Sequence, residues 1–365
     1  MGKRFSRDPI NNKFYFIYKL DTAMIDLRSD TVSKPNDSMR KVIQAAEVGD
    51  DVIGDDPTVQ RLEHLAAKTV DKDAALFVPS GTMANLIALL VHCQNRKAAI
   101  VGSESHILWH EGLGATQLGG IHLISVANEI DGKLSNADLE KFEEDKVADP
   151  AVICIENTHN RCGGRVLDEK YLSEISTRAY GLNSKVHMDG ARIFNAAHAL
   201  NCEVASLTQK VDSVSFCFSK GLGAPIGSVL CGDDEFIKQA RIMRRNLGGG
   251  MRQVGIIASA AEYALQNNVQ RLIDDHDNAK TIALALSKFS QIEINVDEVE
   301  TNIVYFRLNN IDGDKFEKIL ADKGLYVSRP KSKQEIRIVT HIDINDKDIK
   351  QAIEILESVI TSLSS

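Results

Sequence analysis

The segment VSFCFSKGLGAPIGSVL, residues 214–230, decides the fold. It opens as an apolar run, passes through Ser219 and Lys220 into a glycine-rich turn, and ends in a second apolar run. Apolar runs with few polar residues are typical of strands that helices cover on both faces, as in parallel sheets. The segment therefore predicts two buried strands, with a lysine in the loop that joins them.

The rest of the first 275 residues extends this pattern. Short β-rich runs alternate with helical stretches, and the runs are ALFVP (75–79), AAIVGS (98–103), IHLISV (121–126), AVICIE (151–156) and KVHMDG (185–190). Alternation of strands and helices indicates an α/β fold with a mostly parallel sheet. Ligands of such sheets bind outside the carboxyl ends of the strands, so we look for chemistry in the polar residues that follow each run.

The chain changes character after a helical region that we expect at residues 255–289. Runs 293–296, 302–308 and 335–344 read as strands, 313–324 as a helix, and the segment from about Lys347 as a final helix with apolar residues at helical spacing. We predict an N-terminal extension (1–23), a large domain (24–275) and a small α+β domain (276–365).

Composition excludes several classes of protein. The 365 residues carry 43 Lys and Arg against 51 Asp and Glu, a net charge of −8, so a nucleic-acid partner is not expected. No apolar stretch approaches the roughly 20 residues of a membrane span. The six cysteines are dispersed, and no compact ligand cluster indicates a metal. The extension lacks a secretory pattern; we expect a cytoplasmic protein, with a mitochondrial location as the weaker alternative.

Three positions carry candidate chemistry. Lys220 follows a buried strand, where a desolvated amine suits Schiff-base formation, although a surface lysine in a turn fits equally well. Asp189 ends the run 185–190 and could pair with a protonated ring nitrogen, as in enzymes that use pyridoxal 5′-phosphate (PLP), although an Asp-Gly turn is the simpler account of it alone. FVPSGTMAN (77–85) leads a strand into a helix whose N-terminal amides could bind a phosphate, or could form a capped turn.

Several long motifs together resemble the threonine aldolase family, PLP enzymes of fold type I. They occur in one order and are IDLRSDTVSKP (25–35), GDDVIGDDPTV (49–59), FVPSGTMAN (77–85), IENTHN (155–160), HMDGARIFNA (187–196), FSKGLGAPIGS (218–228), GGGMRQVG (248–255) and IRIVTHIDI (336–344). The resemblance covers nearly all of residues 24–343. It implies a seven-stranded, mostly parallel sheet in the large domain and cleavage of L-threonine or L-allo-threonine to glycine and acetaldehyde.

The resemblance also implies roles for single residues. PLP would be held as a Schiff base on Lys220, with Asp189 on its ring nitrogen and His106 over its ring as the candidate base; its other expected contacts are Ser80, Gly81, Thr82, Ser219, Arg192 and Arg252. The substrate carboxylate would be bound by Arg192 and Arg337 with Ser29, and His159 could approach the same place. Arg252 would reach the phosphate of a neighbouring subunit, which implies a homodimer with shared sites that assembles further into a tetramer.

The chain departs from the family where Ile53 replaces a common tyrosine in GDDVIGDD. That tyrosine lies near the partner subunit's substrate, so discrimination at the β-carbon is open, and Trp109, Arg161 and Cys162 could also shape the pocket. The alternatives are another fold type I reaction, β-elimination or transamination, and a PLP-binding protein without turnover.

Overall fold

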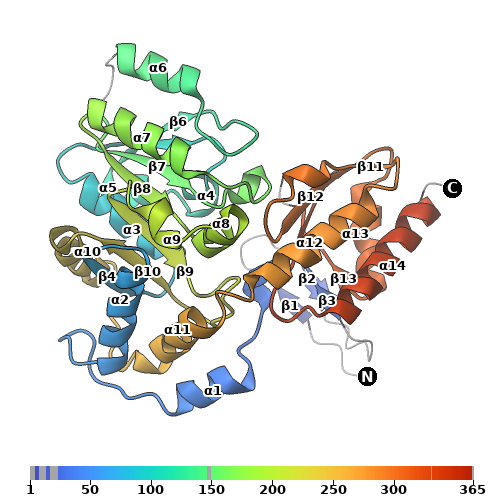
Figure 1. Cartoon of the computed structure of the whole chain (residues 1–365), viewed down its shortest axis with the longest axis horizontal. Helices are drawn as coiled ribbons and strands as arrows, with labels where there is room; N and C mark the ends of the chain where they lie inside the picture. The colour runs from blue at the N-terminus through green and yellow to red at the C-terminus, as the bar shows by residue number, and fades with distance from the viewer. Residues whose placement is uncertain (1–4, 8–13, 17–23, 146–148, 330, 364–365) are drawn as a thin grey trace.

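The computed structural model describes residues 5–7, 14–16, 24–145, 149–329 and 331–363. Most of the extension, residues 1–23, therefore lies outside the described residues, and of it the structure gives only a paired β1 (Phe5–Arg7) and β2 (Phe14–Phe16). The chain forms a large domain around a seven-stranded sheet and a small domain beside it (Figure 1).

The large sheet confirms the α/β prediction. Its strand order is β4-β10-β9-β8-β7-β5-β6, with bounds Ala74–Val78, Ser228–Gly232, Ser213–Cys217, Lys185–Asp189, Val152–Glu156, Ala98–Gly102 and His122–Val126. β5 to β9 run parallel, whereas β10 is antiparallel to both of its neighbours. Residues 227–233, which read as one more parallel-type strand, therefore return in the opposite direction, because the loop at 219–227 turns the chain straight back.

Helices cover both faces of this sheet, which explains why its central strands are buried throughout. One face packs against α2 (Pro57–Thr69), α7 (Glu169–Gly181), α8 (Ile193–Leu200), α9 (Val204–Thr208) and α11 (Gly255–Asn267). The other packs against α3 (Gly81–His92), α4 (His106–His110), α5 (Gly114–Gly119) and α10 (Asp234–Asn246). Further elements of this part are α1 (Asp37–Gln44) and α6 (Asn136–Asp145), with short 3₁₀ turns at Asp30–Val32 and Asn160–Cys162.

The small domain has a core of its own. An antiparallel sheet of β11 (Ile292–Glu293), β12 (Ile303–Leu308) and β14 (Glu335–Val339) packs against α12 (Leu272–Leu286), α13 (Gly313–Asp322) and α14 (Asp346–Leu363). β13 (Leu325–Tyr326) pairs in parallel with β3 (Ile25–Asp26), and Ile25 and Leu27 join the small domain's core. The chain thus contacts the small domain before it enters the large one.

Three expected elements differ in the structure. The helical region 255–289 is two helices, α11 and α12, because residues 268–271 form turns between them. The run 335–344 is a strand only to Val339, beyond which residues 340–345 bend toward α14. The run 293–296 is a strand only at its start, and a 3₁₀ turn, Val296–Glu298, follows. Among the described helices, none has the length and apolar character needed to cross a bilayer.

Candidate functional site

The ends of neighbouring parallel strands bring the predicted site residues together. Asp189 ends β8, Lys220 lies in the loop after β9, and His106 opens α4 after β5. Because the carboxyl ends of parallel strands share one edge of a sheet, the three side chains converge there. Lys220 and His106 are close enough to Asp189 for their positive charges to act on its carboxyl group.

Asp189 is a buried carboxylate held by fixed donors. Its Oδ2 accepts from Asn85 Nδ2 at 2.9 Å, and its Oδ1 accepts from the Ala191 N–H at 3.1 Å. Burial alone would raise the pKa of Asp189, but the charges of His106 and Lys220 and the Asn85 hydrogen bond hold that pKa below its ordinary value. The site therefore keeps a buried negative charge where a cationic ring nitrogen could pair with it.

His106 is held by two carboxylates. Its backbone N–H donates to Glu156 Oε2 at 2.7 Å, and its ring Nδ1 lies 3.0 Å from Glu111 Oε1. Burial would lower the pKa of the His106 ring, but the Glu111 hydrogen bond and the charge of Asp189 raise it above its ordinary value. Burial raises the pKa of Glu111 despite the hydrogen bond from His106, and the nearby Asp189 carboxylate adds to that rise.

The N-terminus of α3 opens at the same edge. Ser80 caps the helix, accepting from the Met83 N–H at 3.2 Å, so its hydroxyl is partly engaged. A Cβ on Gly81 would lie 2.9 Å from Cys217 Sγ, so this position has no room for a side chain. Thr82 is exposed, and Ser219 is half-buried in the loop that carries Lys220. Unpaired amides of a first helical turn bind anions, so this edge suits a phosphate.

Arg192 faces a carboxylate that sequence reasoning did not single out. Its Nε and Nη2 each donate to Asp30 at 2.7 Å, and both side chains are almost fully buried. Burial alone would raise the pKa of Asp30, but the Arg192 guanidinium lowers it to about 2. Two of the three Arg192 nitrogens are thus bound within the chain, and its charge is already balanced.

Arg337 has a different environment. From β14 it donates to Asn160 Oδ1 at 2.8 Å, to the Arg28 carbonyl at 3.1 Å and to Ser328 Oγ at 3.2 Å, all neutral acceptors. Within the described residues, no carboxylate lies at ion-pair distance from it. Burial lowers the pKa of Arg337, and the nearby Arg192 charge acts in the same direction. A largely buried cation without a carboxylate partner is a place where an anionic ligand would bind favourably.

Comparisons with known proteins agree with this geometry. Residues 26–309 match the family model described as "Beta-eliminating lyase". The chain is 44% identical over 347 residues to a probable low-specificity L-threonine aldolase 2 of Arabidopsis thaliana, covering 93% of this chain and 98% of the relative. This chain belongs to the beta-eliminating lyase family, among its threonine aldolases. A low specificity L-threonine aldolase of Escherichia coli K12 is 40% identical over 331 residues, which are 90% of this chain and 97% of that protein.

Solved structures show the same fold. A threonine aldolase of Leishmania major superposes with a TM-score of 0.79 at 19% identity, covering 92% of this chain and 99% of that one. A serine palmitoyltransferase of S. paucimobilis, solved with a bound PLP–myriocin aldimine, gives a TM-score of 0.75 at 15% identity, covering 93% and 88%. The beta-eliminating lyase family is PLP-dependent. Here a buried ionised Asp189, a strand-end Lys220 and a helix N-terminus without room for a Cβ at Gly81 fit that cofactor.

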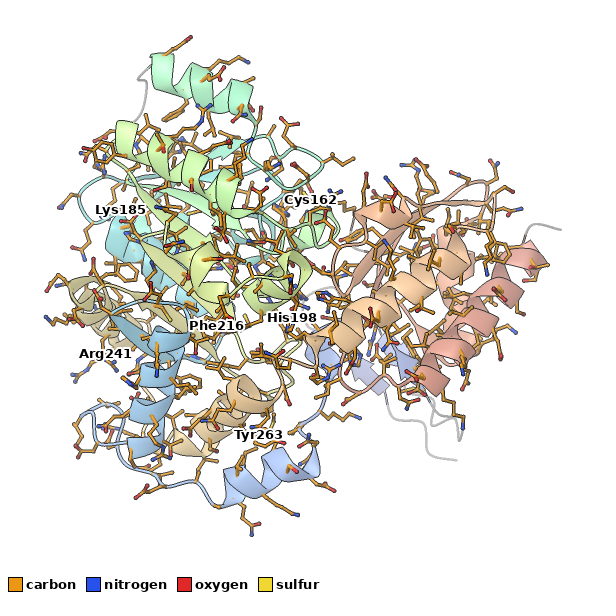
Figure 2. The ribbon with its side chains drawn as sticks, viewed as in Figure 1. Cys162, Lys185, His198, Phe216, Arg241 and Tyr263 are labelled. Carbon is orange, nitrogen blue, oxygen red and sulfur yellow. The ribbon has the colours of Figure 1, made fainter. Side chains whose placement is uncertain are left out.

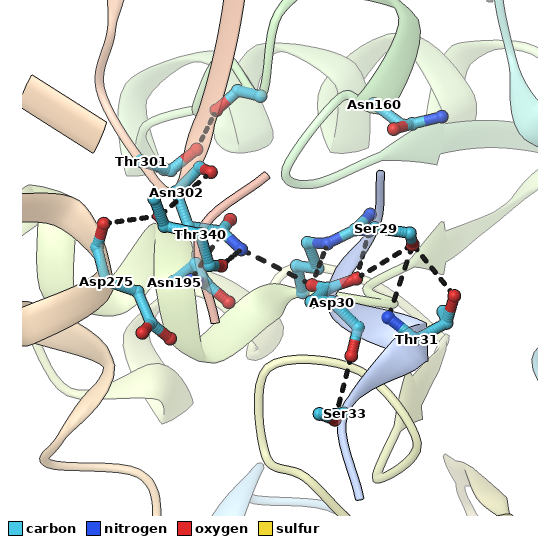
Figure 3. A network of polar contacts seen from close by, with 12 residues as sticks. Ser29, Asp30, Thr31, Ser33, Asn160, Asn195, Asp275, Thr301, Asn302 and Thr340 are labelled. Atoms are coloured by element: carbon cyan, nitrogen blue, oxygen red, sulfur yellow. Dashed lines mark hydrogen bonds and ion pairs between the residues drawn. The ribbon is translucent and has the colours of Figure 1, made fainter. Parts of the chain in front are cut away.

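Three other expected residues of this threonine aldolase chain have distinct surroundings in the structure. Ser29 caps a 3₁₀ turn and accepts from the Thr31 N–H at 3.2 Å, beside Asp30 (Figure 3). Arg252 is exposed and binds Asp50 Oδ2 at 2.8 Å. His159 is fully buried against Gly132, where both ring nitrogens are enclosed and have no partner among the described residues.

The residues near the domain boundary form a separate feature. A cavity of about 700 Å³ lies between the domains, and its lining includes Arg161, Cys162, Tyr305 and Lys331 but neither Lys220 nor Asp189. Figure 2 shows Cys162 on the side of the large domain that faces the small one. Arg161 binds Glu104 Oε2 at 2.9 Å and lies 4.6 Å from the Trp109 ring centroid. Arg161 therefore lines the cavity together with Glu104 and is held from behind by the Trp109 ring.

Sequence reasoning missed three polar residues of the site. Asp30 and Asn85 lie within motifs that carry the family resemblance, and Asn85 is a buried amide on an otherwise apolar helix, which is a usable signal. Glu111 gives no comparable signal beyond its place shortly after His106. Ligand atoms of His106, Glu111 and Asp189 lie within 4.8 Å of one another, a spacing that could hold a metal ion. Their hydrogen bonds to one another and to Asn85 account for the cluster without one.

Proposed function

We propose that this protein uses PLP to cleave L-threonine and L-allo-threonine reversibly to glycine and acetaldehyde. The observation that carries the proposal is that the site holds two opposite charges. One is the buried, ionised Asp189 carboxylate near Lys220 and His106, and the other is the Arg337 guanidinium, which has no carboxylate partner among the described residues. Such a site presents a negative group to a cationic ring and a positive group to an amino-acid carboxylate. Relatives at 44% and 40% identity that are named L-threonine aldolases support this choice of reaction.

The cofactor would be held at four places. Lys220 would bind its aldehyde group, Asp189 its ring nitrogen, and His106 would lie over its ring. The N-terminal turn of α3 would hold the phosphate; its residues Ser80, Gly81 and Thr82 would act there together with Ser219. When bound, PLP accepts the electron pair left on Cα as the Cα–Cβ bond breaks.

The substrate carboxylate would bind Arg337, whose guanidinium geometry suits bidentate contacts. Ser29 lies next to Asp30 and could add a hydrogen bond from its hydroxyl. Arg192 would contribute through its third nitrogen and through its ion pair, which fixes Asp30 between the two domains. His159 could approach the same place, and its buried ring nitrogens have no hydrogen-bond partner among the described residues.

His106 is the proposed base. It would take the proton of the β-hydroxyl group as the Cα–Cβ bond breaks, and Cα would then accept a proton to give glycine. A base must be neutral to accept a proton, so activity should rise as the pH rises through the pKa of His106, which the site holds above its ordinary value.

A homodimer would complete the site. Arg252 is exposed, and the apolar side chains of Val48, Ile53 and Ile256 are exposed as well. Val52 lies 3.3 Å from the position of a Cβ on Gly250, which places the loop of Ile53 against the loop of Arg252. Exposed apolar residues around an arginine are typical of a subunit interface. We propose that this surface contacts a second copy of the chain and that Arg252 reaches the phosphate group of the cofactor bound in that copy. We further propose that such dimers assemble into tetramers.

A second reaction is favoured by one finding, the match to a family model described as a beta-eliminating lyase. The test is product analysis. PLP-loaded protein is incubated separately with L-threonine and L-allo-threonine, with Lys220→Ala as control. Equimolar glycine and acetaldehyde would support aldol cleavage, whereas a keto acid with ammonia would indicate elimination. A keto acid without ammonia, with loss of the lysine-bound cofactor absorbance, would indicate transamination, and no product with that absorbance intact would indicate a binder without turnover.

A further inference from the structure

Asn85 on α3 forms the central link of the site. Its Nδ2 donates to Asp189 Oδ2 at 2.9 Å and to Glu111 Oε1 at 2.8 Å. Its Oδ1 accepts from Ser215 Oγ at 2.8 Å and lies 3.1 Å from His187 Nε2. All the hydrogen-bonding capacity of its NH₂ group is therefore spent on two carboxylates, one of the proposed cofactor site and one beside the proposed base.

The orientation of the Asn85 amide is fixed by its partners. Ionised carboxylates only accept, so the nitrogen and not the oxygen must face Asp189 and Glu111. On the other side, His187 Nδ1 lies 2.9 Å from Ser213 Oγ, which in turn lies 2.8 Å from His92 Nε2. Burial lowers the pKa of His187 to about 4 and that of His92 to about 3, so both rings are neutral. Neutral rings allow every donor in the series His92, Ser213, His187 and Asn85 to point toward Asp189.

The contact between Glu111 and His106 fixes the proton of the imidazole. Oε1 of Glu111 accepts from Asn85 Nδ2 at 2.8 Å and lies 3.0 Å from Nδ1 of His106. In its ionised form the carboxylate can only accept, so Nδ1 then carries the proton of the neutral ring. Nε2 is then the ring atom with a free lone pair. Because a base acts through that lone pair, the direction from which His106 can take a proton is set by Glu111.

We propose that Glu111 and Asn85 are positioning residues of the reaction: Glu111 holds the His106 proton on Nδ1, so that Nε2 accepts the substrate proton, and Asn85 holds the carboxylates of Glu111 and Asp189 in place and ionised. This inference rests on the proposed function for its substrate. Its geometric part concerns the chain alone.

The groups that face His106 come from four places. Glu111 follows α4, His110 lies on the same helix with its ring centroid 5.2 Å away, Asp189 comes from β8 and Lys220 from the loop after β9. His110 and Lys220 oppose a positive charge on His106, whereas Glu111 and Asp189 favour it. The net effect raises the pKa of His106, with Glu111 as the partner in direct contact.

The test is ¹⁵N NMR of the histidine rings in the PLP-loaded protein, with the His106 signals assigned by their absence in His106→Gln. In wild type we expect the neutral ring with its proton on Nδ1. In Glu111→Ala no oxygen remains to accept from Nδ1, so both tautomers of the neutral His106 ring should be populated and the pKa of His106 should fall. In Glu111→Gln an amide oxygen in place of Oε1 can still accept from both Asn85 and His106, so the proton should stay on Nδ1 while the lost negative charge lowers the pKa of His106. In Glu111→Ala the kcat should fall about 100-fold or more while KM changes little, and the acid limb of the rate profile should move to lower pH.

Glu63→Ala is the matched control. Glu63 is also a buried glutamate whose pKa burial raises, but it binds Arg241 and the Phe77 N–H, away from His106. We expect it to leave the His106 tautomer as in wild type. If Glu111→Ala folds poorly, Glu111→Leu serves as the second variant, because it also removes the acceptor. An unchanged His106 tautomer and pKa in folded Glu111→Ala or Glu111→Leu would overturn the inference.

Asn85→Leu, with Asn85→Ala as the smaller replacement, tests the link to Asp189. With ¹⁵N-labelled PLP bound, we expect the ring-nitrogen signal to shift toward its neutral value, because Asp189 loses a donor and holds a shared proton more strongly. An unshifted signal in both variants would contradict the role of Asn85. If wild type shows the Nδ1 tautomer but produces no acetaldehyde, the proposed function fails and the positioning geometry stands.

Discussion

The two arginines nearest the site lie in contrasting regions of the molecule. Arg192, on the large domain, is paired with Asp30 through two hydrogen bonds of 2.7 Å, and both partners are buried. Arg337, on the small domain, donates only to neutral oxygens. Removing one partner of a buried ion pair leaves a costly uncompensated charge, whereas a buried charge that has no partner favours a ligand that supplies one. The same residue type therefore joins the domains in one region and, in the proposed function, binds the substrate in the other.

Further hydrogen bonds surround the ion pair of Arg192 and Asp30 at the domain junction. Asn302 Nδ2 donates to Asp30 at 3.4 Å and to the Thr340 carbonyl at 3.0 Å, and Asn195 reaches Asn302 at 3.4 Å (Figure 3). These contacts join the 3₁₀ turn at Asp30–Val32 to both the large domain and the small domain. Lys220 belongs to the other kind of region, because within the described residues its amine has no carboxylate at ion-pair distance.

The largest expected effect comes from removing that unpaired amine. In Lys220→Ala the group that would bind the cofactor aldehyde is lost, so aldol cleavage should fall on the order of 10⁶-fold, as when a catalytic nucleophile is removed. The absorbance band of the lysine-bound cofactor should vanish with it. Acetaldehyde release and absorbance spectra measure the two effects, and turnover near the wild-type rate would remove Lys220 from the site.

The next effect breaks the paired region. Asp30→Asn leaves the Arg192 charge buried without compensation, which should lower the free energy of unfolding by about 3–5 kcal/mol. Urea denaturation followed by circular dichroism measures it. Asp322→Asn is the control, because its contact with Lys318 is exposed and should contribute less than about 1 kcal/mol. Equal losses in the two variants would mean that the Asp30 pair does not hold the domains.

Arg337→Ala should produce the opposite pattern. Loss of the carboxylate contact should weaken amino-acid binding by about 2–5 kcal/mol, seen as a fall in kcat/KM. The free energy of unfolding should change much less than in Asp30→Asn, because no carboxylate of the chain loses its partner. Steady-state kinetics and urea denaturation on the same variant test both halves. An unchanged KM and kcat/KM would place Arg337 outside the site.

The contrast also marks what sequence could predict. Lys220 and Asp189 could be predicted to lie close together because each follows an apolar run that indicates a buried strand. The carboxyl ends of parallel strands lie at the same edge of the sheet. The ion pair between Arg192 and Asp30 was not predicted, because the two residues are 162 positions apart in the sequence. The local sequence does not distinguish an arginine that binds a carboxylate of its own chain from one whose guanidinium is left to bind a ligand. The role of His159 stays a prediction: its motif locates the strand end, and the structure buries its ring nitrogens without a hydrogen-bond partner among the described residues.

The smallest expected effect is on how the free energy of unfolding depends on pH in the acidic range. It tests the ion pair between Arg192 and Asp30 at the domain junction. Burial would raise the pKa of Asp30, but Arg192 lowers it from 3.8 to about 2. A carboxyl group with a lowered pKa stabilises the fold above its unfolded pKa and loses that contribution as the pH falls through its folded pKa. The shift corresponds to about 2 kcal/mol, of which about half should be lost by pH 3.

Comparison with Asp30→Asn isolates this contribution. The pKa values of Asp275, Glu63 and Glu111 are raised, so these groups favour the folded state as the pH falls and act against the loss in both proteins. The contributions of Glu63 and Glu111 cancel in the difference between wild type and variant, whereas that of Asp275 cancels only in part, because the Asp30 charge helps to raise its pKa. Urea denaturation at pH 5, 4 and 3 should therefore show the stability gap between the two proteins narrowing by about 1 kcal/mol. A gap that stays constant over this range would mean that Asp30 is not held ionised by Arg192.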